Sequence, residues 1–320
     1  MNIDNKKIVP YHEVLAAQKV ISGKVHRTPV VSSTYLGNLT RTKLYFKLEL
    51  FQKTGSFKPR GVLNKLHHLS SEDRKKGVIS ISAGNHAQAL AWVATQLDIS
   101  STIVMPAGSV PSKIEATRDY GGEVILTEDN LLETCRTVQK ERDLILIHPF
   151  DDPKIIAGQG TIGIEILEDV PDVDVVIVGI GGGGLISGIA MALKEQKPEL
   201  KVIGVEPEGA SAMTQSLQHG EPVHLDRVDT IADGLAAPFA GQYTLAHVQD
   251  YVDDVVIVSD LEIVEAMKLI LERNKVTAEP AAASTLAALL SNKVSITQGA
   301  TALCVLSGGN IDQKSLKSLL

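Results

Sequence analysis

The sequence predicts an α/β protein built on parallel sheets and divided into two domains. Short apolar runs alternate with helical patterns along most of the chain, which is typical of parallel strands joined by helical crossovers. Glycine-containing turns directly follow two of these runs, at Gly84 and at residues 181–184. A chain of 320 residues is long enough to form two packed domains.

The first half of the chain predicts the smaller domain. An amphipathic helix over residues 11–22 leads to an extended run over residues 43–48. Four more apolar runs then predict strands, with helical patterns between them. These strands are expected at residues 78–82, 102–105, 123–127 and 144–148. We therefore expect residues 67–152 to form a small α/β domain.

A second series of strands and helices begins at residue 153. Helical patterns cover residues 155–167 and 185–194. The predicted strands of this series are residues 173–179, 201–205, 255–258 and 302–306. This half predicts a second, larger α/β layer.

Lys58 stands in a glycine- and serine-bearing segment, between Phe57 and Pro59. Proline fixes its own φ and disfavours the helical conformation in the preceding residue, so we expect Lys58 in a restrained, extended loop. A lysine that is removed from water loses pKa and becomes a nucleophile or base near neutral pH. A solvated loop lysine is the competing interpretation, and the motifs downstream decide between them.

The first of these motifs, S-A-G-N-H, runs from Ser82 through Ala83 and Gly84 to Asn85 and His86. It lies between an apolar run and a helical pattern, the place where open α/β sheets bind ligands. Asn85 can donate a hydrogen bond to a phenolate oxygen, while Ser82 and the neighbouring N–H groups can hold a carboxylate. The competing interpretation is that Asn85 only caps the helix.

The second motif is a run of four glycines, Gly181, Gly182, Gly183 and Gly184, followed by Leu185. Their backbone N–H groups can wrap a phosphate, and the start of the predicted helix adds partial positive charge. A dinucleotide-binding turn is the main alternative, because Glu206 ends the next predicted strand, as that fingerprint requires. The local sequence leaves both interpretations open.

Together with S-G-G-N at residues 307–310, these motifs occur in the order found in the fold type II family of pyridoxal-phosphate enzymes. From Thr28 to Asp312 the chain resembles the serine/threonine dehydratases of that family, above all the short threonine dehydratases. The resemblance implies a two-domain, three-layer parallel-sheet architecture like that of the tryptophan synthase β chain. Residues 1–66 and 153–320 would then form the large cofactor-binding domain.

The resemblance also implies the roles of individual residues. Lys58 would carry pyridoxal phosphate as a Schiff base, residues 181–184 would bind its phosphate, and Ser307 would face its pyridine nitrogen. Phe57, Asn85 and Leu185 would also contact the cofactor. The substrate would bind to Ser82, Ala83, Gly84 and His86.

The reaction implied is the β-elimination of water from L-threonine, which yields 2-oxobutyrate and ammonia, and from L-serine, which yields pyruvate. Lys58 would remove the Cα proton. A serine racemase or a 3-hydroxyaspartate dehydratase is the alternative within the family. Racemases carry a serine at the position of Ala83, and a methyl group cannot return a proton to the opposite face of Cα. A non-catalytic metabolite-binding protein that keeps this fold is the alternative from another class.

Racemase-like relatives hold a cation, and the resemblance points to Glu206 and the carbonyl of Ala210 as ligands for a divalent or monovalent ion. Ala212 stands where those relatives have an acidic residue. Because hard cations favour several oxygen ligands, the loss of one carboxylate weakens or abolishes such a site.

Composition limits the partners. With 31 basic and 38 acidic residues and no basic run, the chain is not expected to bind nucleic acid. Its two cysteines, Cys135 and Cys304, are too few and too isolated for a disulfide framework or a metal cluster. Residues 1–7 lack an apolar core, so we expect a cytoplasmic protein without export or membrane insertion. An amino acid is the expected substrate, and relatives imply a homodimer or homotetramer.

Overall fold

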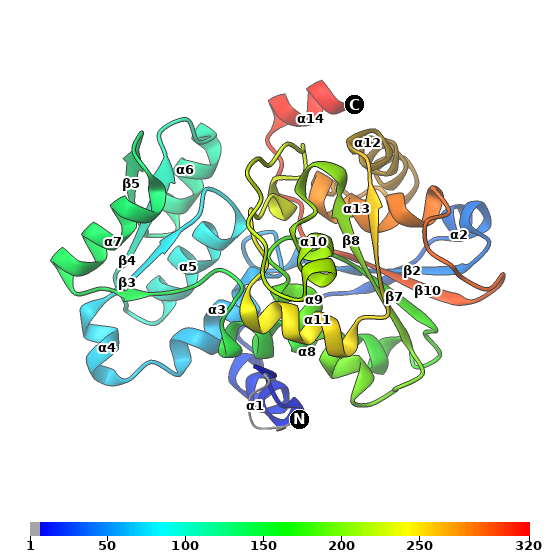
Figure 1. The fold of residues 1–320 in the computed structure, drawn as a ribbon, viewed down its shortest axis with the longest axis horizontal. Coiled ribbons are helices and arrows are strands. Elements are labelled where there is room, and N and C mark those ends of the chain that lie inside the picture. Colours follow the sequence, from blue (N-terminus) through cyan, green and yellow to red (C-terminus); the bar gives the residue numbers. More distant parts are fainter. Residues whose placement is uncertain (1–6) are drawn as a thin grey trace.

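The computed structural model describes residues 7–320, so residues 1–6 of the expected large domain lie outside the described residues. The strands form two sheets in two lobes that lie side by side (Figure 1). The large lobe contains the six-stranded sheet, in the order β1-β2-β10-β7-β8-β9, and the small lobe contains the four-stranded sheet, in the order β5-β4-β3-β6. Every strand pairing in residues 7–320 is parallel except that of β1 with β2. The predicted α/β class with parallel sheets is confirmed.

The elements follow one another as in the sequence. The strands of the large lobe are β1 (Val30–Ser32), β2 (Lys43–Leu48), β7 (Val175–Gly179), β8 (Lys201–Pro207), β9 (Asp254–Val258) and β10 (Thr301–Leu306). Those of the small lobe are β3 (Val78–Ile81), β4 (Ser101–Pro106), β5 (Glu123–Thr127) and β6 (Ile145–Leu146). The α-helices are α1 (Tyr11–Ile21), α2 (Thr34–Thr40), α3 (Lys58–His67), α4 (Ser71–Lys76), α5 (Asn85–Gln96), α6 (Pro111–Asp119), α7 (Leu131–Arg142), α8 (Pro153–Asp169), α9 (Gly184–Lys194), α10 (Ala212–His219), α11 (Gln242–Tyr251), α12 (Asp260–Leu269), α13 (Pro280–Leu290) and α14 (Gln313–Leu319). Short helical turns occur at η2 (Glu49–Phe51), η3 (Glu208–Ala210), η4 (Asp233–Leu235) and η5 (Ile270–Asn274).

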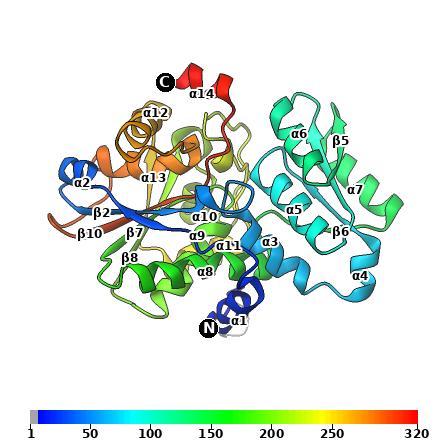
Figure 2. The same ribbon diagram turned by 180° about the vertical axis from the view of Figure 1, so that it is seen from behind.

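The large sheet is buried on both faces. Along β7, Val175 and Ile177 belong to a core shared with α12 and α13, while Val176 and Val178 belong to a second core shared with α8 and α9. This alternation is the period of two that a strand imposes on its side chains. Figures 1 and 2 show the two helical layers on opposite sides of the sheet. The sheet between two helical layers is the three-layer architecture that the resemblance implied.

The predicted strands are all found, with small differences at their ends. The strand expected at residues 144–148 is reduced to β6, which has only two residues, and that expected at 201–205 extends to Pro207. These runs could be recognised because buried parallel strands are continuously apolar. No helix in residues 7–320 combines the length and the apolar character needed to cross a membrane.

The chain passes between the lobes twice, through α3 on the way out and just before α8 on the way back. These two helices touch through their backbones. A Cβ at Gly158 would lie 2.6 Å from the Cα of Gly61, so only glycines allow this approach. The start of α3, which carries the predicted catalytic lysine, is therefore packed directly against the returning helix.

Candidate active site

Lys58 is the first residue of α3, and the expectation of an extended loop is wrong. Phe57 before it already has helical dihedral angles, with φ −58° and ψ −19°. Pro59 falls in the first helical turn, where a missing N–H removes no intrahelical hydrogen bond. The favourable place of proline in a first turn overrides its usual effect on the preceding residue. The helix thus begins at the lysine.

The Lys58 amine lies where the chain returns from the small lobe. Its Nζ donates a hydrogen bond to the carbonyl oxygen of Pro149 at 3.1 Å and lies 5.0 Å from the centre of the Phe57 ring. Burial lowers the pKa of Lys58 to about 8, although the nearby Glu279 carboxylate raises it in part. About a tenth of the amine is therefore uncharged at pH 7, which makes it a usable base or nucleophile.

The four glycines between β7 and α9 form a close-packed turn, named here the glycine cradle (residues 181–184). Gly183 has φ +90°, a conformation that favours glycine. A Cβ at Gly182 would lie 2.3 Å from the ring of Phe150, and one at Gly181 would lie 3.0 Å from a backbone oxygen. Since α9 begins at Gly184, the free N–H groups of its first turn belong to this cradle.

One short segment connects the lysine to the glycine cradle. Pro149 accepts the hydrogen bond of Lys58, and the next residue, Phe150, packs its ring against Gly182. The carboxylate of Asp151 then accepts three backbone N–H groups at the start of α11, at 2.8 to 3.1 Å. The segment is thereby fixed to the large lobe, with the lysine on one side and the cradle on the other.

Asn85 does not cap helix α5. It is the first residue of that helix, its Nδ2 donates to Oε1 of Glu279 at 2.8 Å, and its Oδ1 accepts from Nδ2 of Asn310 at 2.8 Å. The capping position belongs to Gly84, which offers no side chain. The Asn85 amide is therefore held by the large lobe and is directed by residues far away in the sequence.

Ser307 follows β10 and lies beside the residues that precede Lys58 (residues 53–57), named here the lysine segment. The N–H of Phe57 donates to the carbonyl oxygen of Ser307 at 3.1 Å, and Ser56 pairs with Gly308 as an antiparallel bridge. A Cβ at Gly308 would lie only 3.2 Å from Nδ2 of Asn85. The structure thus brings together the lysine, the asparagine and the serine that the sequence singled out.

The turn before α5, named here the asparagine turn (residues 82–86), has an open part and a closed part. Ser82, Ala83 and Gly84 are half-buried, and a Cβ at Gly84 would meet no heavy atom within 4 Å. The His86 side chain is buried instead, where its Nε2 is 3.1 Å from Oγ of Ser80. Burial and the Lys58 charge lower the pKa of His86 well below its usual value, so its imidazole is neutral.

Glu279 is a site residue that the sequence reasoning missed. It lies just before α13, is only 7 % exposed, and burial raises the pKa of its carboxyl group to about 7. A glutamate before a proline looks like an ordinary helix start. The useful signal was its position in the apolar stretch V-T-A-E-P-A-A-A, because an acid that is buried there needs a polar partner.

The residues do not fit a cation site. Both carboxylate oxygens of Glu206 accept hydrogen bonds from α10, namely from the N–H groups of Met213 and Thr214 and the Thr214 hydroxyl, at 2.6 to 2.8 Å. Ala210 lies in η3, Ala212 begins α10, and no group of three acidic, histidine or cysteine ligands is present in residues 7–320. Glu206 anchors a helix. Because both of its oxygens are directed at α10, this carboxylate does not face a ribose as the dinucleotide fingerprint requires.

The site does fit pyridoxal phosphate. Six buried side-chain atoms in residues 7–320 lack a hydrogen-bond partner, and three of them lie in the residues before Lys58 and in the asparagine turn, at Oγ1 of Thr54, Oγ of Ser56 and Nδ1 of His86. Such atoms are rare in folded proteins and indicate a missing polar partner. An amine, an amide, a hydroxyl group and a cradle of N–H groups match the aldehyde, the phenolate, the ring nitrogen and the phosphate of this cofactor.

Comparison with known proteins agrees with this geometry. Residues 21–308 match the model of the family described as pyridoxal-phosphate dependent enzyme. The chain is 44 % identical to the L-threonine ammonia-lyase of Thermotoga maritima, over 98 % of this chain and 78 % of that protein. It is 42 % identical to the catabolic L-threonine dehydratase TdcB of Escherichia coli, over 98 % of this chain and 96 % of that protein.

Among solved structures, maize serine racemase superposes with a TM-score of 0.92 at 41 % identity, covering 97 % of this chain and 96 % of that one. The fold is therefore shared along nearly the whole chain. The chain belongs to the family of pyridoxal-phosphate-dependent enzymes.

Proposed function

We propose that this chain is an ammonia-lyase that converts L-threonine to 2-oxobutyrate and ammonia, and L-serine to pyruvate and ammonia. Water is lost in the elimination and taken up again in the hydrolysis that releases ammonia. The observation that carries this proposal is the position of Lys58, a basic amine with a pKa lowered to about 8 between the asparagine turn and the segment that packs on the glycine cradle. Its similarity to an L-threonine ammonia-lyase and to a catabolic L-threonine dehydratase supports the choice of substrate.

The residues divide the work by chemistry. Pyridoxal phosphate, when bound, supplies the electron sink for the substrate carbanion. The N–H groups of the glycine cradle and the start of α9 would hold its phosphate, Asn85 would donate to its phenolate oxygen, and the Ser307 hydroxyl group would face its ring nitrogen. Phe57 and Leu185 would line its surroundings. Lys58 takes the Cα proton on Nζ.

The asparagine turn holds the substrate. Ser82, Ala83, Gly84 and His86 lie at the start of α5, where the helix favours a carboxylate. The N–H of Ser82 donates to the carbonyl oxygen of Val104 and that of Gly84 to Oγ of Ser82, so the N–H groups of Ala83 and His86 would bind the substrate carboxylate. The methyl group of Ala83 has no acidic proton, so no group at this position can protonate Cα from the face opposite Lys58. Elimination is therefore favoured over racemisation.

The wider organisation follows from the same interpretation. Residues 1–66 and 153–320 form the large cofactor-binding domain, and residues 67–152 form the small domain. In support, every strand of the four-stranded sheet lies between residues 78 and 146. The protein works in the cytoplasm as a homodimer or homotetramer on a free amino acid.

The test measures 2-oxo acid release from L-threonine by protein reconstituted with pyridoxal phosphate, with Lys58→Ala as the control. We expect rapid formation of 2-oxobutyrate that the substitution abolishes. Chiral analysis of serine and an assay with 3-hydroxyaspartate run in parallel. Preferential turnover of 3-hydroxyaspartate, or conversion of L-serine to D-serine without 2-oxo acid, would reject the proposal in favour of those activities.

A further inference from the structure

A chain of amide hydrogen bonds leads from the lysine segment to Asn85, and its direction can be worked out atom by atom. Nδ2 of Asn310 donates to the carbonyl oxygen of Thr54 at 2.7 Å and to Oδ1 of Asn85 at 2.8 Å. A backbone carbonyl can only accept, so this end of Asn310 is the nitrogen, and both of its hydrogens are used. The end of Asn85 that meets Asn310 must then be its oxygen.

The orientation of Asn85 follows from this. Its Nδ2 points to the other side and donates one hydrogen to Oε1 of Glu279 at 2.8 Å. The second hydrogen of this nitrogen makes no hydrogen bond within residues 7–320, and Asn85 is only half-buried. The two partners of the Asn85 amide, Asn310 and Glu279, thus leave one of its N–H groups free, in a direction that the protein sets.

Glu279 is held firmly enough to set this direction. Its N–H donates to the carbonyl oxygen of Gly308 at 3.1 Å, and its carboxylate accepts the backbone N–H of Asn310. A Cβ at Gly308 would lie 2.5 Å from Oε1 of Glu279, so the carboxylate and the turn after β10 are in close contact. The acid is therefore joined to the same turn that begins with Ser307.

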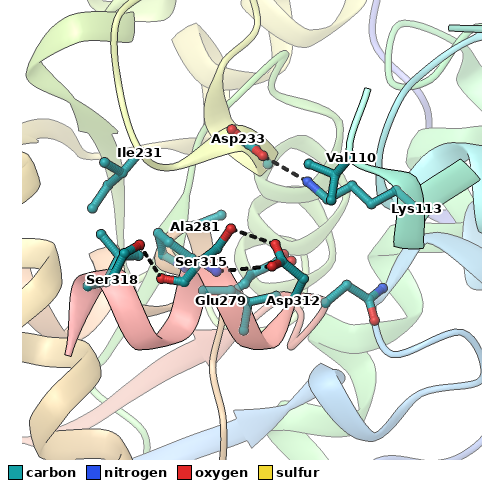
Figure 3. A pocket seen from close by; sticks show the side chains of 14 residues that line it. Val110, Lys113, Ile231, Asp233, Glu279, Ala281, Asp312, Ser315 and Ser318 are labelled. Carbon is teal, nitrogen blue, oxygen red and sulfur yellow. Dashed lines mark hydrogen bonds and ion pairs between the residues drawn. The ribbon is translucent and has the colours of Figure 1, made fainter. Parts of the chain in front are cut away.

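Among the described residues 7–320, Glu279 has no ion-pair partner. It lines a cavity of ≈ 250 Å³ between α6, η4 and α14 together with three other charged residues (Figure 3). Lys113 and Asp233 pair with each other at 2.8 Å, and Asp312 accepts hydrogen bonds from the start of α14. Lys58 acts on Glu279 only through its charge. Burying a carboxylate lowers the stability of the folded protein, and without an ion-pair partner Glu279 does not regain this free energy through a salt bridge.

We propose that Glu279 is a positioning residue: its carboxylate holds the Asn85 amide so that the one free N–H points at the phenolate oxygen of bound pyridoxal phosphate. This inference rests on the role given to Asn85 in the proposed function. The protein would then tolerate the unfavourable burial of Glu279 because this carboxylate fixes the direction of the hydrogen-bond donor at the cofactor. Asn310 acts with Glu279, since it holds the opposite end of the same amide.

The test compares Glu279→Ala, Glu279→Gln and Asn85→Ala with the double variant Glu279→Ala/Asn85→Ala. Cofactor affinity and the visible absorbance of the bound cofactor are measured across pH, without any amino acid present. Glu279→Ala should weaken cofactor binding about tenfold or more and change the absorbance, because Asn85 loses a hydrogen bond to a charged group. Glu279→Gln keeps an acceptor oxygen and should retain most of the affinity.

The double variant decides between positioning and any direct role. If Glu279 acts through Asn85, the double variant binds the cofactor as Asn85→Ala does alone. Losses that multiply would overturn the proposal and assign Glu279 a contact or cavity function of its own. Should Glu279→Ala not fold, Asn310→Ala is made in the unsubstituted protein and in Asn85→Ala. It tests the same positioning of the Asn85 amide through its oxygen, which Asn310 holds. Since no amino acid is present, failure of threonine turnover would reject the proposed function without affecting this result.

Discussion

The helix that carries Lys58 and the turn that faces it are held in opposite ways. Behind the lysine, a buried ion cluster (Lys47, Glu49, Arg60 and Glu165) lies at 0 to 8 % exposure. Arg60 makes two hydrogen bonds to each of the two glutamates, at 2.7 to 2.9 Å, and Lys47 contacts Glu165 at 2.7 Å. The asparagine turn has no such support at Ser82, Ala83 and Gly84.

This difference separates what must stay in place from what must admit a ligand. Burying four charges costs solvation, and such clusters commonly stabilise a protein no more than apolar side chains of the same volume would. They do impose one geometry, because each charge needs its partners in fixed directions. The lysine thus has a rigid base, while the half-buried turn opposite it keeps open space at Gly84.

The largest effect is expected from Arg60→Met. The substitution leaves Glu49 and Glu165 buried without a guanidinium, which should lower the free energy of unfolding by about 3–5 kcal/mol. Chemical denaturation measures the change. Arg27→Met is the matched control, since Arg27 pairs with Glu168 and Asp169 at the surface and should cost under about 1 kcal/mol. Equal losses for the two arginines would show that burial does not distinguish these clusters.

In the cofactor-free protein, Lys58→Met is expected to change the free energy of unfolding by less than Arg60→Met and to increase it. Burial lowers the pKa of Lys58 to about 8, whereas the unfolded chain has the ordinary lysine pKa, so the unfolded state binds more protons between pH 8 and about 10.5. Below pH 8 the charged amine destabilises the folded state by an amount on the order of 1–3 kcal/mol.

Lys58→Met should therefore be more stable than the unsubstituted protein at pH 7. The gap should narrow as the pH rises from 8 to 10, where the folded lysine has already lost its charge. Melting temperatures across this range measure the effect. A gap that stays constant with pH would mean that the desolvated charge is not its cause.

Gly182→Ala tests the cradle, which belongs to the fixed side of the site. A Cβ there would lie 2.3 Å from the Phe150 ring, so the ring or the cradle must shift, at a cost of about 1–3 kcal/mol. Cofactor affinity should fall with stability, and Gly182→Ala combined with Phe150→Ala should recover part of both. Without recovery, the loss would come from the backbone of the turn and not from the ring.

The smallest stability effect is expected at Gly84, on the open side. Since an added Cβ meets nothing within 4 Å, Gly84→Ala should change the free energy of unfolding by no more than about 0.5 kcal/mol. It should nevertheless raise KM for the amino acid, because the new methyl group enters the space proposed for the substrate. A marked loss of stability with an unchanged KM would show that the asparagine turn is closely packed at Gly84 and does not hold the substrate there.

The strands and the two glycine turns could be predicted because their signals are local. An apolar run followed by glycine indicates a strand and a turn whatever the rest of the chain does. The buried ion cluster could not be predicted in this way, since Arg60 and Glu165 lie far apart in the sequence and meet only when α3 packs on α8. Glu279 was missed for the same reason. Its partner Asn85 belongs to the other lobe.

Lys58 shows a different kind of limit. Its chemistry was predicted from its motif, yet its backbone conformation was not, because two local rules about Pro59 point in opposite directions. The rule for residues before proline favours an extended lysine, while the rule for first helical turns favours a helix. The packing of α3 on α8 through Gly61 and Gly158 agrees with the second rule.

The position of β10 in the large sheet has a consequence for synthesis on the ribosome. This strand lies between β2 and β7 and pairs with both, so the sheet stays in two unjoined parts until residue 306 has left the exit tunnel. Lys58 is made well before Ser307 and Asn310, so the pairing of Ser56 with Gly308 and the hydrogen bond from Asn310 to Thr54 form only after β10 has been made. A nascent chain therefore cannot assemble the cofactor site before the segment from β10 to Asn310 has been made, although Lys58 itself is synthesised much earlier.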